Sequence, residues 1–182
     1  MPNTALLLID IQNDYFPNGL WEVPDMPAAS KNAARLLADA RTRAMPVVHI
    51  RHQFPTHDAP FFRPNSVGAD IHPSVAPQGD EPVIEKQRPN SFVNTSLKAH
   101  LDGLGIKNLV LCGAMSQMCV DSTARAAVDL GYLVTIIEDA CAAKAQVFNG
   151  VEVPAAMVHA AIMAPLAGSF AKVLSTAAYL RP

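Results

Sequence analysis

The sequence predicts an α/β protein with a mostly parallel sheet, and three observations lead to this fold class. Apolar segments of strand length alternate along the chain with longer segments of helical periodicity. The first apolar segment is uninterrupted, which is typical of a strand covered on both faces. The 182 residues are enough to bury a full core. We therefore expect a single domain over residues 1–182, built from right-handed βαβ units.

In the first half of the chain, helical spacing and proline separate the elements. Ala33, Leu36 and Leu37 fall on one face of a helix, and Pro46 ends it because proline cannot continue a helix. The elements expected here are a strand at residues 4–10, a helix at 27–44, strands at 46–51 and 82–85, and a helix at 95–104.

In the second half, short apolar runs again alternate with helical segments. Gly131 marks the end of one helix, because glycine accepts the backbone conformation that commonly follows a helix, and an apolar strand comes directly after it. The elements expected here are a strand at residues 107–112, a helix at 117–131, a strand at 132–138, a helix at 154–164 and a strand at 171–175.

One long connection interrupts this regular alternation. Residues 53–81 contain five prolines and two glycines and show neither helical nor strand periodicity. A loop of this length inside a compact domain is usually functional or covers something. The alternative is a surface detour without a role.

Composition excludes several classes of protein. Half of the residues are apolar and 16% are charged, which excludes a disordered chain, and the net charge of −2 indicates neither a nucleic-acid surface nor a polybasic membrane patch. The apolar run at residues 5–9 lacks a basic leader and is too short to span a bilayer. Cys112, Cys119 and Cys141 have no CxxC spacing, so we expect neither a disulfide framework nor a zinc ribbon. These features predict a soluble cytoplasmic protein.

Three reactive side chains stand at the expected carboxyl ends of different strands, where sites form in open α/β sheets. Asp10 ends the first strand, Lys86 follows the third, and Cys119 follows the fourth at a strand-to-helix turn. An acid, an ammonium and a thiol brought together there make a nucleophilic site. Taken singly, each has an alternative: a turn cap for Asp10, a solvated charge for Lys86 and a small buried apolar residue for Cys119.

Charge considerations favour an ionised Cys119. A free cysteine has a pKa near ~8.5, so holding it mostly ionised at neutral pH needs a fall of ~2 units, or about 2.7 kcal/mol. The N–H groups of a helix's first turn supply roughly 0.3–2 kcal/mol. A lysine ammonium at ~4 Å supplies up to ~4 kcal/mol. We therefore expect Lys86 to be the main stabiliser of a Cys119 thiolate, with Asp10 accepting the thiol proton.

At these residues the chain resembles the isochorismatase-like cysteine hydrolases, a superfamily that includes nicotinamidases and N-carbamoylsarcosine amidases. The resemblance covers nearly the whole chain in the right order. The matching segments are LIDIQNDYF at 8–16, VHIRH at 48–52, EKQRPNSF at 85–92, CGAMSQMCVDSTAR at 112–125 and GSFA at 168–171, the last followed by Val173, Ser175 and Thr176.

The resemblance implies a three-layer, Rossmann-like α/β/α fold around a six-stranded parallel sheet of order 3-2-1-4-5-6. It implies a catalytic triad of Asp10, Lys86 and Cys119. It also implies a cis peptide between Ala114 and Met115, and an oxyanion hole made by the N–H groups of Met115 and Cys119. The implied pocket walls, for which core packing is the alternative, are Phe16, Trp21, Phe92 and Met118.

The end of the second strand carries further candidates for substrate binding, namely His49, Arg51 and His52. Arg51 suits a carboxylate, and a structural ion pair is its alternative. Nicotinamidases that bind a divalent metal carry Asp-x-His after this strand, followed by two more histidines. Here the stretch reads His-Gln-Phe at 52–54, with His57 and His72 scattered beyond it, so we expect no metal and no other cofactor.

These features together predict a hydrolase that cleaves a small-molecule amide-type C–N bond through a thioester on Cys119. Some isochorismatases that cleave a vinyl ether have lost the cysteine, so its presence favours covalent hydrolysis. A vinyl ether hydrolase and a non-catalytic ligand-binding paralogue are the alternatives. We expect a small-molecule substrate, no nucleic-acid or membrane partner, and a homodimer or larger homo-oligomer, for which an apolar C-terminal helix with Met157, Ile162 and Met163 is a candidate surface.

Overall fold

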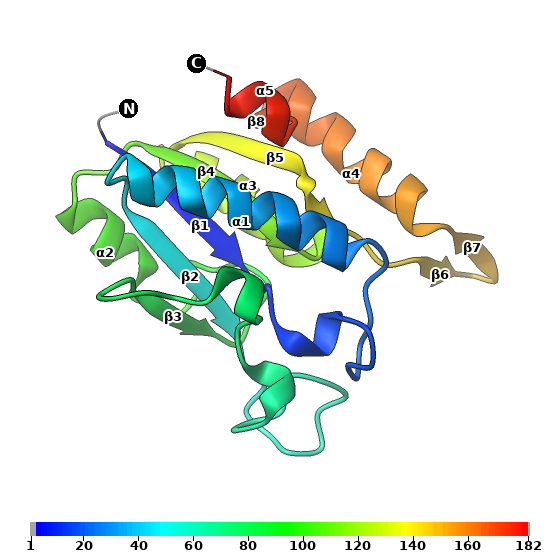
Figure 1. Cartoon of the computed structure of the whole chain (residues 1–182). Helices are drawn as coiled ribbons and strands as arrows, with labels where there is room; N and C mark the ends of the chain where they lie inside the picture. The colour runs from blue at the N-terminus through cyan, green and yellow to red at the C-terminus, as the bar shows by residue number, and fades with distance from the viewer. Residues whose placement is uncertain (1–2, 182) are drawn as a thin grey trace.

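The computed structural model describes residues 3–181 and has three layers, with a parallel sheet between helices (Figure 1). The strands of this sheet are β1 (Thr4–Ile9), β2 (Val47–His52), β3 (Val83–Lys86), β4 (Asn108–Ala114), β5 (Leu133–Ala142) and β8 (Ala171–Leu174). The helices are α1 (Met26–Thr42), α2 (Leu97–Gly103), α3 (Asp121–Asp129), α4 (Ala155–Ser169) and α5 (Thr176–Tyr179). Shorter turns are η1 (Asn13–Tyr15), η2 (Val67–Ala69), η3 (Pro73–Val75) and the π-helical η4 (Ser116–Val120).

The sheet has the predicted topology. Within the described residues, its six strands run parallel in the order β3-β2-β1-β4-β5-β8. This is the predicted order 3-2-1-4-5-6, because β8 is the sixth strand of the sheet along the chain. The structure adds an antiparallel hairpin of β6 (Gln146–Phe148) and β7 (Val151–Val153), which the periodicity did not predict because each strand has only three residues.

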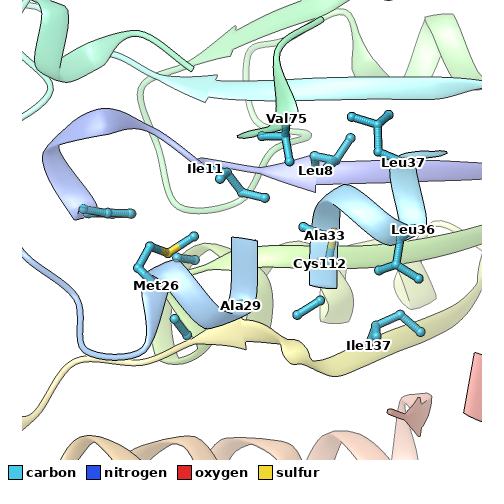
Figure 2. Close-up of a cluster of buried hydrophobic side chains, with 14 of the residues drawn as sticks. Leu8, Ile11, Met26, Ala29, Ala33, Leu36, Leu37, Val75, Cys112 and Ile137 are labelled. Carbon is cyan, nitrogen blue, oxygen red and sulfur yellow. The ribbon is translucent and has the colours of Figure 1, made fainter. Parts of the chain in front are cut away.

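α1 covers one face of the sheet with the side chains that its spacing predicted. Ala33, Leu36 and Leu37 are at most 2% exposed and belong to one buried cluster with Leu8 of β1 and Ile137 of β5 (Figure 2). On the opposite face, a second cluster joins alternate residues of β1 to α2, α3 and α4. β1 is therefore buried on both faces, as its uninterrupted apolar sequence predicted, and each buried leucine stabilises the fold by roughly 1.5–3 kcal/mol.

The long connection over residues 53–81 is fastened to the body of the domain by Asp14. Its carboxylate accepts hydrogen bonds from the backbone N–H groups of Phe62, at 2.7 Å, and Leu20, at 3.1 Å. Gly68 packs so closely on this carboxylate that an added Cβ would lie 2.2 Å from Oδ1, so a larger residue would displace the carboxylate from its hydrogen bonds. The connection is thus an ordered cover rather than a loose surface detour, and it brings Phe54 and Phe61 to a pocket beneath it.

The end of the same connection is clamped by Glu81. Arg41 of α1 donates two hydrogen bonds to its carboxylate, at 2.7 and 2.8 Å, and His49 of β2 lies 3.0 Å from Oε2. The hydrogen bonds from Arg41 lower the pKa of Glu81 from 4.5 to about 2. His49, a candidate for substrate binding, is instead 1% exposed and belongs to this structural network.

α4 and the hairpin before it carry apolar side chains that the rest of the chain leaves exposed. α4 contains no Asp, Glu, Lys or Arg, and Met157 near its start is 62% exposed. The hairpin adds Val147, Phe148 and Val151, each more than 60% exposed, and extends from the sheet beside the start of α4 (Figure 1). Among residues 3–181, no helix has both the length and the apolar character that crossing a membrane requires.

We predict that Glu81→Gln lowers the free energy of unfolding at pH 7 by about 1–2 kcal/mol, because it removes a partly buried, charge-assisted pair. The folded-state pKa of Glu81 lies below its unfolded value, so its contribution is complete above pH 4.5 and disappears as the pH falls toward 2. Urea unfolding at pH 7 and near pH 3 should therefore show a difference between wild type and variant that shrinks on acidification. The exposed Glu85→Gln is the control, and an equal loss in both variants would contradict the clamp.

Candidate active site

Asp10, Lys86 and Cys119 meet at the carboxyl edge of the sheet, as their positions in the sequence predicted. Asp10 directly follows β1, Lys86 ends β3, and Cys119 lies in η4 after β4. The Lys86 ammonium lies 2.7 Å from Oδ2 of Asp10 and 3.2 Å from Sγ of Cys119. The three residues are only 0%, 2% and 5% exposed, respectively. Their charges therefore interact in a site from which water is largely excluded.

The turn that carries Cys119 differs from the predicted continuous helix. β4 continues to Ala114, the peptide bond between Ala114 and Met115 is cis, and the chain then makes the π-helical turn η4 before α3 begins at Asp121. Gly113 has a φ of 126°, and a Cβ there would lie 2.0 Å from the carbonyl oxygen of Ile9. This close approach of β4 to the end of β1 sets Cys119 beside Asp10, and only glycine permits it.

Burial changes the expected protonation state of the nucleophile. Burial raises the pKa of the Cys119 thiol, the charge of Asp10 raises it further, and Lys86 lowers it. Burial alone would lower the pKa of Lys86, but Asp10 and Cys119 raise it above its ordinary value. The charge argument from the sequence counted the stabilising charges and left out the cost of desolvating the anion, which opposes them. Burial and Asp10 thus favour the protonated thiol, and Lys86 opposes them.

Asp10 is placed to take the proton from this thiol. Its side chain is fully buried, and apart from the Lys86 ammonium neither carboxylate oxygen has a hydrogen-bond donor among residues 3–181. Potential ligand atoms of Asp10, His52 and Cys119 lie within 4.8 Å of one another. The carboxylate thus retains lone pairs that can accept the Cys119 proton when a substrate arrives.

His52 joins the site from the end of β2, between the strands that carry Lys86 and Asp10. Its Nδ1 lies 3.1 Å from the Lys86 ammonium, and burial lowers its pKa from 6.5 to about 4. The side-chain amide of Gln12 bonds to both the N–H and the C=O of His52, each at 2.8 Å. Sequence reasoning missed the role of Gln12, although a polar amide within the first matching segment was a signal for it.

A pocket of about 230 Å³ opens beside Cys119, and most of its wall is apolar. Tyr15 forms part of the wall, and burial raises the pKa of its hydroxyl well above 10. Met115, a predicted oxyanion-hole residue, also lines the pocket, while the use of its N–H for that purpose stays a prediction. The lining residues are Tyr15, His52, Phe54, Phe61, Gln87, Arg88, Pro89, Met115, Met118 and Cys119.

Of the seven residues predicted to form pocket walls or bind substrate, His52 and Met118 line this pocket, and the other five, His49 among them, lie elsewhere. Arg51 pairs with Glu85, at the sheet edge, and lies 3.9 Å from Asp70. Three aromatic residues are occupied by packing instead: Phe16 stacks on His72 at 3.6 Å, Trp21 on Phe61 at 4.8 Å, and Phe92 on Tyr132 at 5.9 Å. Local sequence could not distinguish these packing roles from pocket walls.

The potential ligand atoms of Asp10, His52 and Cys119 are close enough together to suggest a metal site. However, the Lys86 ammonium contacts all three side chains, at 2.7, 3.1 and 3.2 Å. A divalent cation at this point would meet a buried positive charge at short range, which is strongly unfavourable. The residues present therefore do not suit a metal while Lys86 is protonated.

A three-layer sheet of this order, with an acid, an ammonium and a thiol at its carboxyl edge, defines a Rossmann-like α/β protein with a nucleophilic site. The chain belongs to the isochorismatase family of hydrolases, because the isochorismatase domain matches residues 4–178. It is 48% identical to the uncharacterized isochorismatase family protein YddQ of Bacillus subtilis, over 98% of this chain and 99% of that protein.

Two further comparisons agree with this family. A crystal structure of an isochorismatase-family hydrolase from Oleispira antarctica is 49% identical, superposes with a TM-score of 0.95, and is matched over 98% of this chain and 96% of that one. Maleamate amidohydrolase of Pseudomonas putida is 33% identical, over 74% of this chain and 70% of that enzyme.

We predict that iodoacetamide near neutral pH modifies Cys119 before Cys112 and Cys141, because Cys119 opens onto the pocket beside an ammonium. Asp10 raises the pKa of the thiol and Lys86 lowers it, so Asp10→Asn should accelerate labelling of Cys119 and Lys86→Met should slow it. Intact-mass and peptide analysis against time measures each rate.

Cys141 is the internal control for this experiment, because burial raises its pKa to about 12 and neither Asp10 nor Lys86 is among the groups that shift it. Its labelling rate should be the same in all three proteins. Earlier labelling of Cys112, or equal rates at Cys119 in both variants, would show that the charges assigned to this site do not act on its thiol.

Proposed function

We propose that the protein is a metal-independent cysteine hydrolase that cleaves an amide-type C–N bond of a small molecule through a Cys119 thioester. One observation carries this proposal: the Lys86 ammonium contacts both Asp10 and Cys119, and the three residues lie beside an apolar pocket. A relative that acts on an amide, the maleamate amidohydrolase of Pseudomonas putida, supports the same reaction class.

In the first half of the reaction, Asp10 accepts the proton of Cys119 as Sγ forms a bond to the carbonyl carbon of the substrate. The electron pair of the C=O bond moves to oxygen, and we assign the N–H groups of Met115 and Cys119 to hold that oxyanion. Lys86 stabilises the sulfur anion during proton transfer. The C–N bond then breaks, and the nitrogen leaves with the proton carried by Asp10, so that a thioester remains.

In the second half, water takes the place of the departed amine. Asp10, again a carboxylate, removes a proton from this water as its oxygen attacks the thioester carbon. The C–S bond breaks, Sγ recovers the proton from Asp10, and the carboxylic acid leaves. The cycle returns the site to a carboxylate, an ammonium and a thiol, in which the charges of Asp10 and Lys86 offset each other.

We predict that Cys119→Ala and Asp10→Asn each reduce amide turnover by at least about a thousandfold, because each removes a group that the covalent scheme cannot replace. Ammonia release from a panel of small primary amides and ureides measures turnover, and rapid quenching with intact-mass analysis detects the acyl-enzyme. Cys119→Ala should still fold, because Asp10 and His52 remain as acceptors for the Lys86 ammonium, and a melting curve checks this.

The matched control is Cys141→Ala, a substitution of another buried cysteine, which should retain turnover. Ammonia release without any acyl adduct, or from Cys119→Ala, would refute the covalent scheme. Cleavage of a vinyl ether substrate without an adduct, together with no ammonia release from the panel, would favour the vinyl ether type of hydrolysis. Ligand binding without turnover across the whole panel would favour a non-catalytic paralogue.

We further propose that the protein forms a homodimer or larger homo-oligomer through α4 and the hairpin beside it. A helix that is apolar around its whole circumference is usually buried, yet much of α4 is exposed here. Light scattering after size-exclusion chromatography should give at least twice the 19.4 kDa of one chain. Phe148→Asp with Met157→Asp should shift the protein toward one chain, and a wild-type protein of single-chain mass would refute the assignment.

A further inference from the structure

We propose that the N–H at Nε2 of His52 is a fixed hydrogen-bond donor in the pocket, and that it selects small amides carrying a hydrogen-bond acceptor close to the scissile carbonyl. The proposal rests on the proposed function, because it assigns the substrate class of the same pocket. It adds a specificity role to a residue that also contacts Lys86.

The Lys86 ammonium determines which nitrogen of His52 carries the proton. An ammonium has three N–H donors and no acceptor. Its three close partners are Oδ2 of Asp10 at 2.7 Å, Sγ of Cys119 at 3.2 Å and Nδ1 of His52 at 3.1 Å. Nδ1 must therefore be an acceptor without a proton, and the neutral ring carries its hydrogen on Nε2.

That remaining N–H has no partner of its own. His52 is 7% exposed, and its Nε2 is buried without a hydrogen-bond partner among residues 3–181. A buried donor left unpaired destabilises a protein, so such groups call for an explanation. His52 is part of the pocket wall together with Cys119, and a substrate acceptor is the partner that this position lacks.

The ring of His52 is held firmly enough to act as a selective donor. Gln12 fixes the backbone of His52 on both sides of the residue, at 2.8 Å each. The rings of Phe54 and Phe62 flank the imidazole, with centroids 4.6 and 6.1 Å away. A donor that is already oriented loses little entropy on binding, so its hydrogen bond contributes more to discrimination.

Because the rest of the pocket wall is mostly apolar, this donor strongly affects which ligands bind. Most of its other side chains are apolar or aromatic, while Gln87 and Arg88 are exposed at the surface. In an apolar pocket, a polar group that a ligand leaves unpaired discriminates far more strongly than a missing methylene does. The volume of about 230 Å³ limits the occupant to a small molecule. The substrate class is thus a compact acyl amide with an ether, keto or aromatic-nitrogen acceptor in its acyl part.

The tautomer can be tested without any activity assay. In protein labelled with ¹⁵N-histidine, we expect the side-chain resonances of His52 to show a neutral ring protonated on Nε2 from about pH 5.5 to 8.5, where an ordinary histidine titrates. The resonances of His52 are identified as those that disappear from the spectrum of His52→Gln. Lys86→Met should release the ring to a mixture of tautomers. A His52 ring that titrates in this range, or carries its proton on Nδ1, overturns the proposal.

Selectivity is tested with methoxyacetamide and butanamide, which differ by an ether oxygen in place of one methylene. In Cys119→Ala, which cannot turn over, we expect methoxyacetamide to bind about tenfold to a hundredfold more tightly by NMR titration. Adding His52→Phe should abolish this preference. His52→Gln should keep part of it, because a glutamine can accept from Lys86 and donate to the ligand.

The control is His72→Phe, which changes a histidine that stacks on Phe16 outside the pocket and should leave the preference intact. Equal binding of the two amides, or a preference that survives His52→Phe in a protein of unchanged melting temperature, overturns the proposal. A wild-type protein that keeps the tautomer and the binding preference but releases no ammonia would instead refute the proposed hydrolysis alone.

Discussion

The buried Lys86 ammonium is the interaction on which the rest of the site depends. An ammonium taken out of water is strongly destabilised unless acceptors surround it, and an unpaired buried charge costs several kcal/mol. Asp10, Cys119 and His52 supply those acceptors from three other segments of the chain. The same ammonium requires an unprotonated Nδ1 at His52, and it opposes burial and Asp10, which raise the pKa of the Cys119 thiol. The packing of these four side chains and their protonation therefore depend on the same buried charge.

The topology explains how four segments can reach one point. β3, β2, β1 and β4 are neighbours in the sheet, and each delivers one of these four side chains at or beyond its carboxyl end. Parallel strands place those ends on the same edge of the sheet, so residues far apart in the sequence can meet there. The connection over residues 53–81, which covers the pocket, is held by hydrogen bonds to Asp14 at one point and through Glu81 at another. Burial, to which this cover contributes, raises the pKa of the Cys119 thiol, and in the proposed mechanism Asp10 takes up its proton.

Charge and recognition are divided between two parts of the site. The charged groups gather around Lys86, where they balance one another, whereas the pocket wall is mostly apolar. Because few polar groups face the substrate, a single fixed donor can decide which small molecules fit. This division also explains why a divalent metal does not suit the site: the position that its ligands would surround is occupied by a protonated amine.

The sequence by itself determined the alternation of elements, the buried first strand and the three residues that converge as Asp10, Lys86 and Cys119, because apolar periodicity and strand ends are local features. Resemblance to a known family added the order of the strands. Only the tertiary structure decided that Arg51 pairs with Glu85, that Phe16 and Phe92 pack on other rings, and that burial raises the pKa of the Cys119 thiol. Each of these outcomes depends on burial or on partners distant in the chain. The spacing of residues in the sequence reveals neither burial nor distant partners.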